Sequence, residues 1–158
     1  MLRLPGHYKA GFNWDTSNYR DNYFDVNGGA RALTGLSAMK HDGRAQVWVL
    51  ADQMICRHGP GDNDGLILIG SYAHDQPDTA VFDHFFWAGL IDRGFWAERP
   101  NDQINFGVAY YIVSDKLRAT QMIEQSLGLP LSGAIRATPI LNRPGRRTVL
   151  AQALETGA

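Results

Sequence analysis

Two histidine–aspartate neighbours are the residues whose types could support metal binding or acid–base chemistry. His74 is followed by Asp75, and Asp83 is followed by His84. Imidazole and carboxylate groups bind divalent metals and transfer protons. The spacing of these pairs matches no known pattern of metal ligands, and polar residues inside a strand more often face water or a lumen. We therefore predict neither a metal site nor a catalytic residue at these positions.

Other residue types that could do chemistry give weaker signals. Asp15, Asp52 and Asp75 could form a carboxylate pair of the kind that hydrolyses glycosidic bonds, but the sequence gives no separation between them. The aromatic run 85–87 could stack on sugar or base faces, although side chains alternate along a strand and only one parity could meet a solute. The sequence therefore predicts a protein that is not an enzyme and needs no cofactor.

The polar residues that recur with a two-residue period give a stronger functional signal. From His7 to Thr16, and again from Gln103 to Ser114, polar side chains alternate with apolar ones. A wall built from the polar parity would carry both charges and many hydrogen-bonding groups, which suits neutral polyhydroxylated solutes better than a selected ion. The predicted pore-lining residues, which would contact sugars, are His7, Lys9, Asn13, Asp15, Arg93, Gln103 and Asn105. The solvated face of a soluble sheet explains the same parity and stays open as an alternative.

These side chains must be positioned by strands, and the sequence predicts six of them. Their expected ranges are 7–16, 30–40, 45–56, 65–76, 82–94 and 103–114, with Asp42–Gly43 as a hairpin turn between the second and third. Strands in soluble domains average about five or six residues, whereas a strand crossing a bilayer needs about nine to eleven. The predicted fold is all-β: an antiparallel up-and-down meander that forms part of a transmembrane β-barrel. The apolar parity is rich in aromatic residues suited to lipid interfaces, namely Tyr8, Phe12, Trp14, Phe106 and Tyr110.

One short helix is predicted after Ser114. Ser114 or Asp115 can cap its start and Gly128 its end. Ala119, Met122, Ile123 and Leu127 recur at helical spacing and predict its apolar face. We expect residues 1–142 to form one partial β-barrel domain and residues 143–158 to form an atypical, irregular tail.

Composition excludes several classes of protein. The chain has 158 residues with a formal charge of -1, so a strongly basic nucleic-acid binder is excluded. A hydrophobic content of 44% excludes a disordered chain. Cys56 is the only cysteine, which excludes a disulfide framework within one chain. Residues 1–10 lack the apolar run of a secretion signal, and no run of apolar residues is long enough for a helical span.

Three long segments carry a family resemblance. The runs VLADQMICR (49–57), GLILIGSYAHDQPDT (65–79) and FFWAGLIDRGFWAERPNDQINFGVAYYIVSD (85–115) resemble the later part of carbohydrate-selective outer-membrane porins of the OprB type. GFNWDTSNY near the start and NGGARALTGLSA are similar too, so that the resemblance covers roughly residues 5–142. The final residues RRTVLAQALETGA resemble no strand of that family.

The resemblance implies a barrel of about sixteen strands that lets sugars such as glucose diffuse passively across the outer membrane of Gram-negative bacteria. Its expected partners are monosaccharides and outer-membrane lipid, and not nucleic acid. Six strands with open edges also predict association with other barrel segments or a homo-oligomer. We hypothesise that the chain is a truncated porin segment whose anomaly begins near Gly145. A soluble all-β carbohydrate-binding module is the alternative function.

Overall fold

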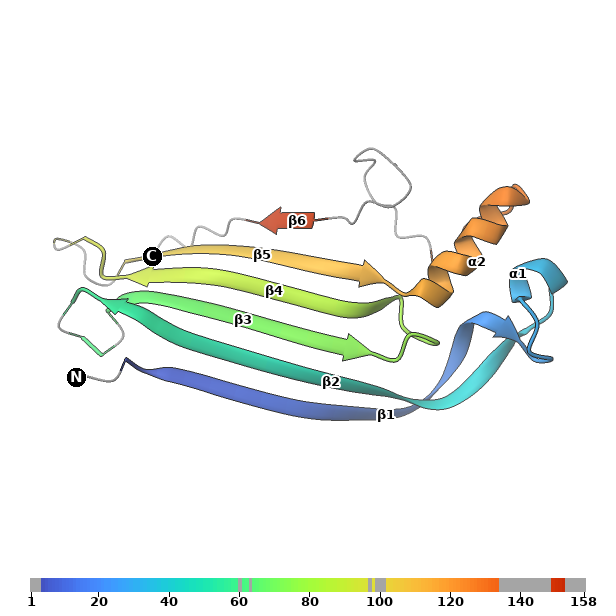
Figure 1. Cartoon of the computed structure of the whole chain (residues 1–158), viewed down its shortest axis with the longest axis horizontal. Helices are drawn as coiled ribbons and strands as arrows, with labels where there is room; N and C mark the ends of the chain where they lie inside the picture. The colour runs from blue at the N-terminus through green and yellow to red at the C-terminus, as the bar shows by residue number, and fades with distance from the viewer. Residues whose placement is uncertain are drawn as a thin grey trace.

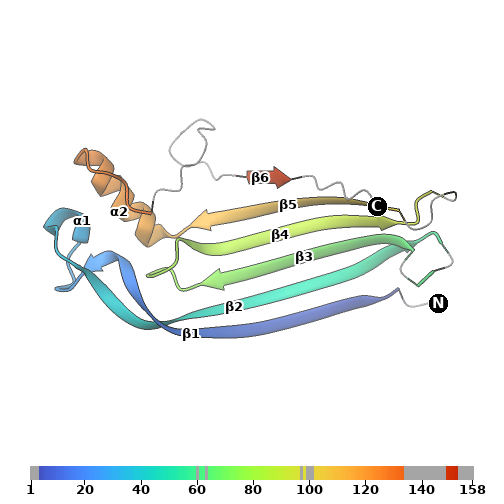
Figure 2. The same ribbon diagram turned by 180° about the vertical axis from the view of Figure 1, so that it is seen from behind.

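The structure is a single open antiparallel sheet with two short helices at one end (Figures 1 and 2). It is a computed structural model that describes residues 4–59, 61–62, 64–96, 98, 102–133 and 149–152. Its strands are β1 (Gly6–Asp25), β2 (Ala38–Arg57), β3 (Gly65–Asp75), β4 (Phe82–Arg93), β5 (Gln103–Val113) and β6 (Val149–Gln152), and its helices are α1 (Arg31–Thr34) and α2 (Asp115–Ser126). The strands lie side by side in chain order, which confirms the predicted all-β meander with a short helix near the C-terminus.

Strand length separates this sheet from that of an ordinary soluble domain. β3, β4 and β5 have 11, 12 and 11 residues, and β1 and β2 have 20 each. At about 3.3 Å per residue, an 11-residue strand spans roughly 36 Å. This is enough for a tilted strand to cross the hydrocarbon core of a bilayer.

The prediction of two strands joined at Asp42–Gly43 is wrong. Residues 30–37 contain an isolated bridge from Ala30 to Phe24, the short helix α1 and loop. β2 runs without interruption through Asp42 and Gly43. The register of β1 against β2 slips here, because Arg44 faces Asp15 whereas Asp42 faces Asn18. Gly43 has a φ of 99°, so its freedom from a side chain serves a β-bulge instead of a turn.

Beyond this bulge, β1 and β2 continue as a hairpin that reaches the helices, and we call this the helix end of the sheet (Figure 1). Asn22 ties the hairpin to distant parts of the chain. Its N–H donates to Asp78 O at 2.7 Å, and its Nδ2 donates to Ala80 O at 2.6 Å and Pro77 O at 3.1 Å. Its carbonyl accepts from the Thr120 hydroxyl at 2.6 Å. The helix end is therefore one packed unit made of the β1–β2 hairpin, the β3–β4 turn and α2.

The helix α2 begins and ends close to the predicted positions but buries a different face. Ser114 is its N-cap residue, and its hydroxyl donates to Pro77 O instead of to the helix. Gly128, with a φ of 68°, closes the C-terminus. The predicted apolar face is wrong, because the buried residues are Leu117, Thr120 and Glu124. Of the predicted face, Met122 is 66% and Leu127 52% exposed.

This helix turns polar residues inward because they meet loop groups. Glu124, which is 5% exposed, accepts hydrogen bonds from the N–H and the hydroxyl of Ser132 at 2.6 and 2.5 Å. Thr120, fully buried, reaches the carbonyl of Asn22. Hydrophobic periodicity alone could not predict this face, because hydrogen-bonded polar residues occupy two of its three buried positions.

The C-terminal part contains one short strand in the described residues. β6 pairs with β5 from Gly107↔Gln152 to Tyr110↔Val149, inside the range 143–158 for which an irregular tail was predicted. The rest of that range lies outside the described residues, and the boundary at residue 142 stays a prediction. Within the described part of the chain, neither helix has the length and apolar character needed to span a membrane.

Candidate pore-lining face

The pairing register divides the side chains of the sheet into two faces. One row of paired residues runs Tyr8, Ala51, Gly70, Ala88 and Val108 across five strands. Because neighbours along a strand point to opposite sides, the adjacent row of His7, Asp52, Ile69, Gly89 and Gly107 belongs to the other face. We call the face of Tyr8 the apolar face and the face of His7 the polar face.

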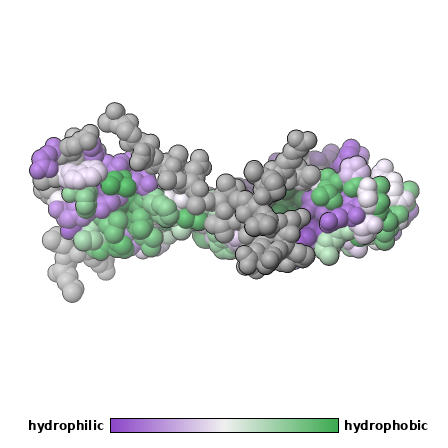
Figure 3. All heavy atoms as spheres, turned by 90° about the horizontal axis from the view of Figure 1, so that it is seen from above, coloured by the Kyte–Doolittle hydropathy of each residue, from purple (hydrophilic) through white to green (hydrophobic). Residues whose placement is uncertain are grey.

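The apolar face exposes the large hydrophobic side chains that a soluble protein would bury. The exposed fractions include 61% for Phe12, 49% for Val49 and 52% for Phe106. The five aromatic residues predicted to share one face all lie on it, since Tyr8, Phe12 and Trp14 share its parity in β1 and Phe106 and Tyr110 share it in β5. Figure 3 shows a continuous hydrophobic area on the surface of the molecule, next to hydrophilic residues.

The buried hydrophobic core is correspondingly small. Among the described residues, the buried hydrophobic side chains are Met54, Ala80 and Leu117. Two of the three belong to the helix end instead of the sheet. A soluble domain gains free energy by burying apolar residues in a core. Here that gain requires an apolar medium that covers the apolar face.

The seven predicted pore-lining residues all lie on the polar face. They comprise four positions of β1, one of β4 and two of β5, namely His7, Lys9, Asn13, Asp15, Arg93, Gln103 and Asn105. His7 Nδ1 lies 2.8 Å from Asp52 Oδ2, and Asn13 donates to Gln46 Oε1 at 2.8 Å. Arg93 and Gln103 are register partners on β4 and β5.

These seven residues do not form one cluster. β1 and β5 are separated by four inter-strand spacings of about 4.8 Å each, or roughly 19 Å. His7 and Gln103 also lie at the end of the sheet opposite the helices, whereas Asp15 lies near the helix end. They are spread over a wall and do not converge on one small site.

A denser polar cluster on the same face includes residues that the sequence analysis did not select. Asp75 Oδ2 accepts from Gln46 Nε2 at 2.9 Å, and Asp75 Oδ1 lies 3.7 Å from Arg44 Nε. Asn13 extends this network through Gln46. The guanidinium of Arg44 also lies 4.5 Å from the ring centre of Tyr19. Every second residue of β2 from Arg44 to Asp52 lies on the polar face. Because Trp48 and Leu50 are among them, the sequence shows no polar alternation in this strand, and the cluster could not be predicted from it.

Glycines on the polar face accommodate two tryptophans that interrupt its polar pattern. A Cβ built on Gly11 would meet the Trp48 ring at 2.3 Å, so this indole lies directly on the neighbouring strand. A Cβ built on Gly89 or Gly107 would lie 3.3 Å from the Trp87 indole. Aromatic side chains that cover glycines of adjacent strands stabilise sheets and keep the backbone shielded.

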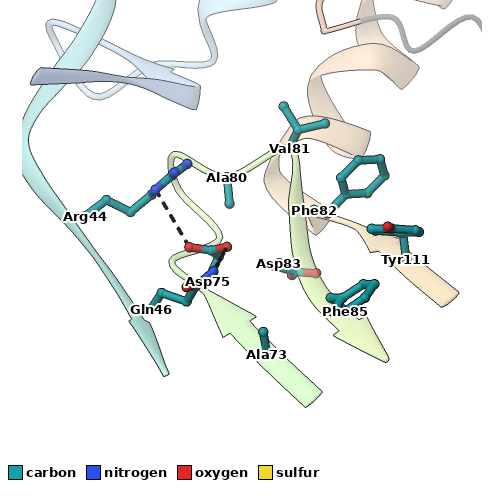
Figure 4. Close-up of a pocket in the computed structure, with 10 residues that line it drawn as sticks. All are labelled: Arg44, Gln46, Ala73, Asp75, Ala80, Val81, Phe82, Asp83, Phe85 and Tyr111. Carbon is teal, nitrogen blue, oxygen red and sulfur yellow. Dashed lines mark hydrogen bonds and ion pairs between the residues drawn. The ribbon is translucent and has the colours of Figure 1, made fainter. Parts of the chain in front are cut away.

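An aromatic and acidic depression lies beside the Arg44–Asp75 pair at the helix end of the polar face (Figure 4). Its volume is about 330 Å³. The ring centre of Tyr111 lies 5.1 Å from that of Phe82 and 4.8 Å from that of Phe85. Asp83 also lines the depression and is 7% exposed.

The two histidine–aspartate neighbours separate onto opposite faces. Asp75 and Asp83 line the depression on the polar face, whereas the rings of His74 and His84 stack 4.5 Å apart on the apolar face. Among the residues that the structure describes, no group of three His, Cys, Asp or Glu side chains is close enough to hold a metal ion.

Two buried carboxylates, Asp21 and Asp25, stabilise the helix end. Both lie in the part of β1 beyond the bulge, outside the part of the sheet that β3, β4 and β5 share. Asp21, 3% exposed, would have a raised pKa from burial alone. Hydrogen bonds from Phe24 N–H, His41 and Tyr23 N–H outweigh burial and lower the pKa below 3.8. The pKa of Asp25 is lowered by the Thr34 hydroxyl at 2.6 Å, and then by the N–H groups of the 27–29 turn.

Together, the long meander, the exposed apolar face and the polar face define a class of protein: the wall of a transmembrane β-barrel. The chain belongs to the carbohydrate-selective porins of the OprB family, whose family model matches residues 2–141. The family assignment confirms the resemblance seen in the sequence.

Three porins are similar to this chain. Porin B of Pseudomonas aeruginosa is 30% identical over 121 residues, which are 77% of this chain and 27% of that protein. The putative porin QuiX of Acinetobacter baylyi is 26% identical over 119 residues, 75% of this chain and 24% of that protein. The high-pH structure of Pseudomonas putida OprB is 34% identical with a TM-score of 0.74, over 80% of this chain and 30% of that one. The chain thus spans about a quarter of the length of the curated relatives it matches.

Proposed function

We propose that this chain forms part of the wall of a bacterial outer-membrane barrel through which neutral monosaccharides such as glucose diffuse passively. The observation that carries the proposal is the separation of faces by the register. Exposed Phe12, Val49 and Phe106 lie on one side, and the Asn13–Gln46–Asp75 network lies on the other. A lipid-facing side and a solute-facing side are the two requirements of a pore wall.

The polar face suits sugars because its groups are mixed in sign and type. Amides at Asn13 and Gln46, carboxylates at Asp52 and Asp75, and the guanidinium of Arg44 offer both donors and acceptors. A hydroxyl group can both donate and accept hydrogen bonds. A polyhydroxylated solute can therefore exchange hydrogen bonds with water for hydrogen bonds with the polar face at little cost in free energy. We propose that the predicted residues His7, Lys9, Asn13, Asp15, Arg93, Gln103 and Asn105 line this passage.

The proposal also assigns partners and location. The apolar face packs against outer-membrane lipid of a Gram-negative bacterium, and the free edge of β1 pairs with another strand of the same barrel or of a second copy. The soluble carbohydrate-binding module is less well supported. It would leave Tyr8, Phe12 and Trp14 in water at 71%, 61% and 57% exposure.

Liposome swelling tests the proposed function. We expect vesicles that contain the protein, assembled in the membrane, to swell in iso-osmotic glucose faster than protein-free vesicles. We expect slower swelling in an oligosaccharide, because a larger solute diffuses more slowly through a pore. Equal swelling with and without assembled protein would contradict the proposal. Detergent-free extraction as a monomer would support the soluble module instead.

A further inference from the structure

The depression on the polar face combines an aromatic surface with charged groups in one small volume. Four neighbouring strands and the β3–β4 turn contribute to it (Figure 4). The side chains that matter for recognition are Arg44, Gln46, Asp75, Asp83, Phe85 and Tyr111. Its volume of about 330 Å³ lies at the lower end of the range of about 300–1,000 Å³ that is typical of small-molecule sites. Such a volume suits one sugar ring and not a chain of them.

One side of the depression offers polar groups whose positions are already fixed. Gln46 and Arg44 both contact Asp75, and Asn13 orients Gln46 from the next strand. Arg44 approaches Asp75 through Nε, and its guanidinium carries further N–H donors in a rigid plane. Because these side chains hold one another, little conformational entropy is lost when a ligand binds them.

The other side offers ring faces. Phe85 and Tyr111 pack with their ring centres 4.8 Å apart, and Phe82 adds a third ring. The face of an aromatic ring carries negative charge density, and the axial C–H groups of a pyranose carry positive charge density. A sugar ring can therefore stack here while its hydroxyls reach the polar side.

Asp83 gives an independent indication of a ligand. Its side chain is more than nine-tenths buried, and its Oδ1 atom has no hydrogen-bond partner. A buried acceptor without a donor costs free energy, and such an atom in a native structure needs an explanation. Asp83 lines the depression, so a hydroxyl entering the depression could supply the missing donor.

We propose that this depression is a binding subsite for a single neutral pyranose. The inference rests on the proposed function and specifies where on the wall the passing sugar is held. Two carboxylates and one guanidinium line the subsite, so its formal charge is negative. It therefore disfavours sugar acids such as gluconate while it admits glucose.

Block of ion current by glucose in planar lipid bilayers tests the subsite in the assembled protein. Phe85→Leu keeps apolar volume but removes the ring face, and Asp83→Asn removes a charge. We expect Phe85→Leu to raise the glucose concentration for half-block by about three- to tenfold. We expect Asp83→Asn to weaken glucose block and to narrow the difference between glucose and gluconate.

Asp62→Asn is the matched control, because Asp62 is a fully exposed carboxylate in the loop between β2 and β3, at the end of the sheet opposite the helices and the depression. It should leave glucose block unchanged. Equal block in the wild type and all three variants, with swelling in glucose intact, would overturn the subsite but leave the proposed function standing. No glucose-dependent swelling or block in the wild type would overturn the proposed function and the subsite together.

Discussion

A pair of arginine substitutions at adjacent positions of β3 tests which face of the sheet meets lipid. Leu68 lies on the apolar face and is 47% exposed, whereas Ile69 lies on the polar face opposite Asp52. Leu68 is two residues from Gly70, the middle of β3, and so about 7 Å along the strand from its midpoint. Arginine facing lipid costs about 2–4 kcal/mol at the midplane and less toward the interfaces.

At this depth we expect Leu68→Arg to lower the free energy of unfolding by about 2 kcal/mol. This corresponds to about a 30-fold fall in the folding equilibrium constant. Urea unfolding of the protein in phospholipid vesicles, followed by tryptophan fluorescence, measures this difference. The slope of the transition should stay the same, because the surface exposed on unfolding does not change.

Ile69→Arg is the control, since it places the same charge at almost the same depth on the other face. The new guanidinium would lie beside Asp52, and we expect a change below about 1 kcal/mol. A larger loss for Ile69→Arg than for Leu68→Arg would refute the assignment of the two faces.

Three further predictions concern the helix end and the bulge. Asn22→Ala removes the donor to the buried Ala80 carbonyl and should lower the free energy of unfolding by about 1–3 kcal/mol, measured by urea unfolding. An unchanged free energy of unfolding would mean that the β1–β2 hairpin is independent of the β3–β4 turn. Gly43→Ala should cost at least about 1–2 kcal/mol in the same assay, because its φ is 99° and a Cβ would lie 2.7 Å from the Trp14 ring; an unchanged midpoint would contradict the bulge. The lowered pKa values of Asp21 and Asp25 mean that their ionised forms stabilise the helix end above about pH 4, and this stability is lost as the pH falls through their folded-state pKa values below 3.8. The protection factors of amides 21–29 against hydrogen exchange should therefore fall only in strong acid, and a fall in these protection factors as the pH is lowered from 7 to 5 would argue against these carboxylates.

The sequence predicted the two faces of the sheet better than it predicted the helix end. Strict alternation over Tyr8–Trp14 and Ile104–Tyr110 predicted which residues share a face, because the two-residue period is a direct consequence of strand geometry. The prediction of a turn at Asp42–Gly43 was wrong because a glycine with a positive φ occurs in β-bulges as well as in hairpin turns. Only the pairing with the partner strand distinguishes the two.

The denser cluster on the polar face could not be predicted from one strand at a time. Asp75 meets Gln46 because β2 and β3 pair in one register, and a slip of one residue would send these side chains to opposite faces. Trp87 and Phe85 lie on the polar face although they are hydrophobic, so a rule based on polarity passed over them. The buried face of α2 was missed because a rule based on hydrophobicity passes over polar residues that point inward, here Thr120 and Glu124.

We propose that the polar face lines a water-filled pore and that the apolar face does not. Adjacent residues of β1 test it directly in a background with Cys56→Ser: Asn13→Cys places a thiol on the polar face, and Phe12→Cys places one on the apolar face. A charged methanethiosulfonate reagent is added while ion current through the assembled protein is recorded in a planar lipid bilayer. We expect the reagent to lower the conductance of Asn13→Cys and to leave that of Phe12→Cys unchanged. Loss of conductance in Phe12→Cys, with none in Asn13→Cys, would contradict it.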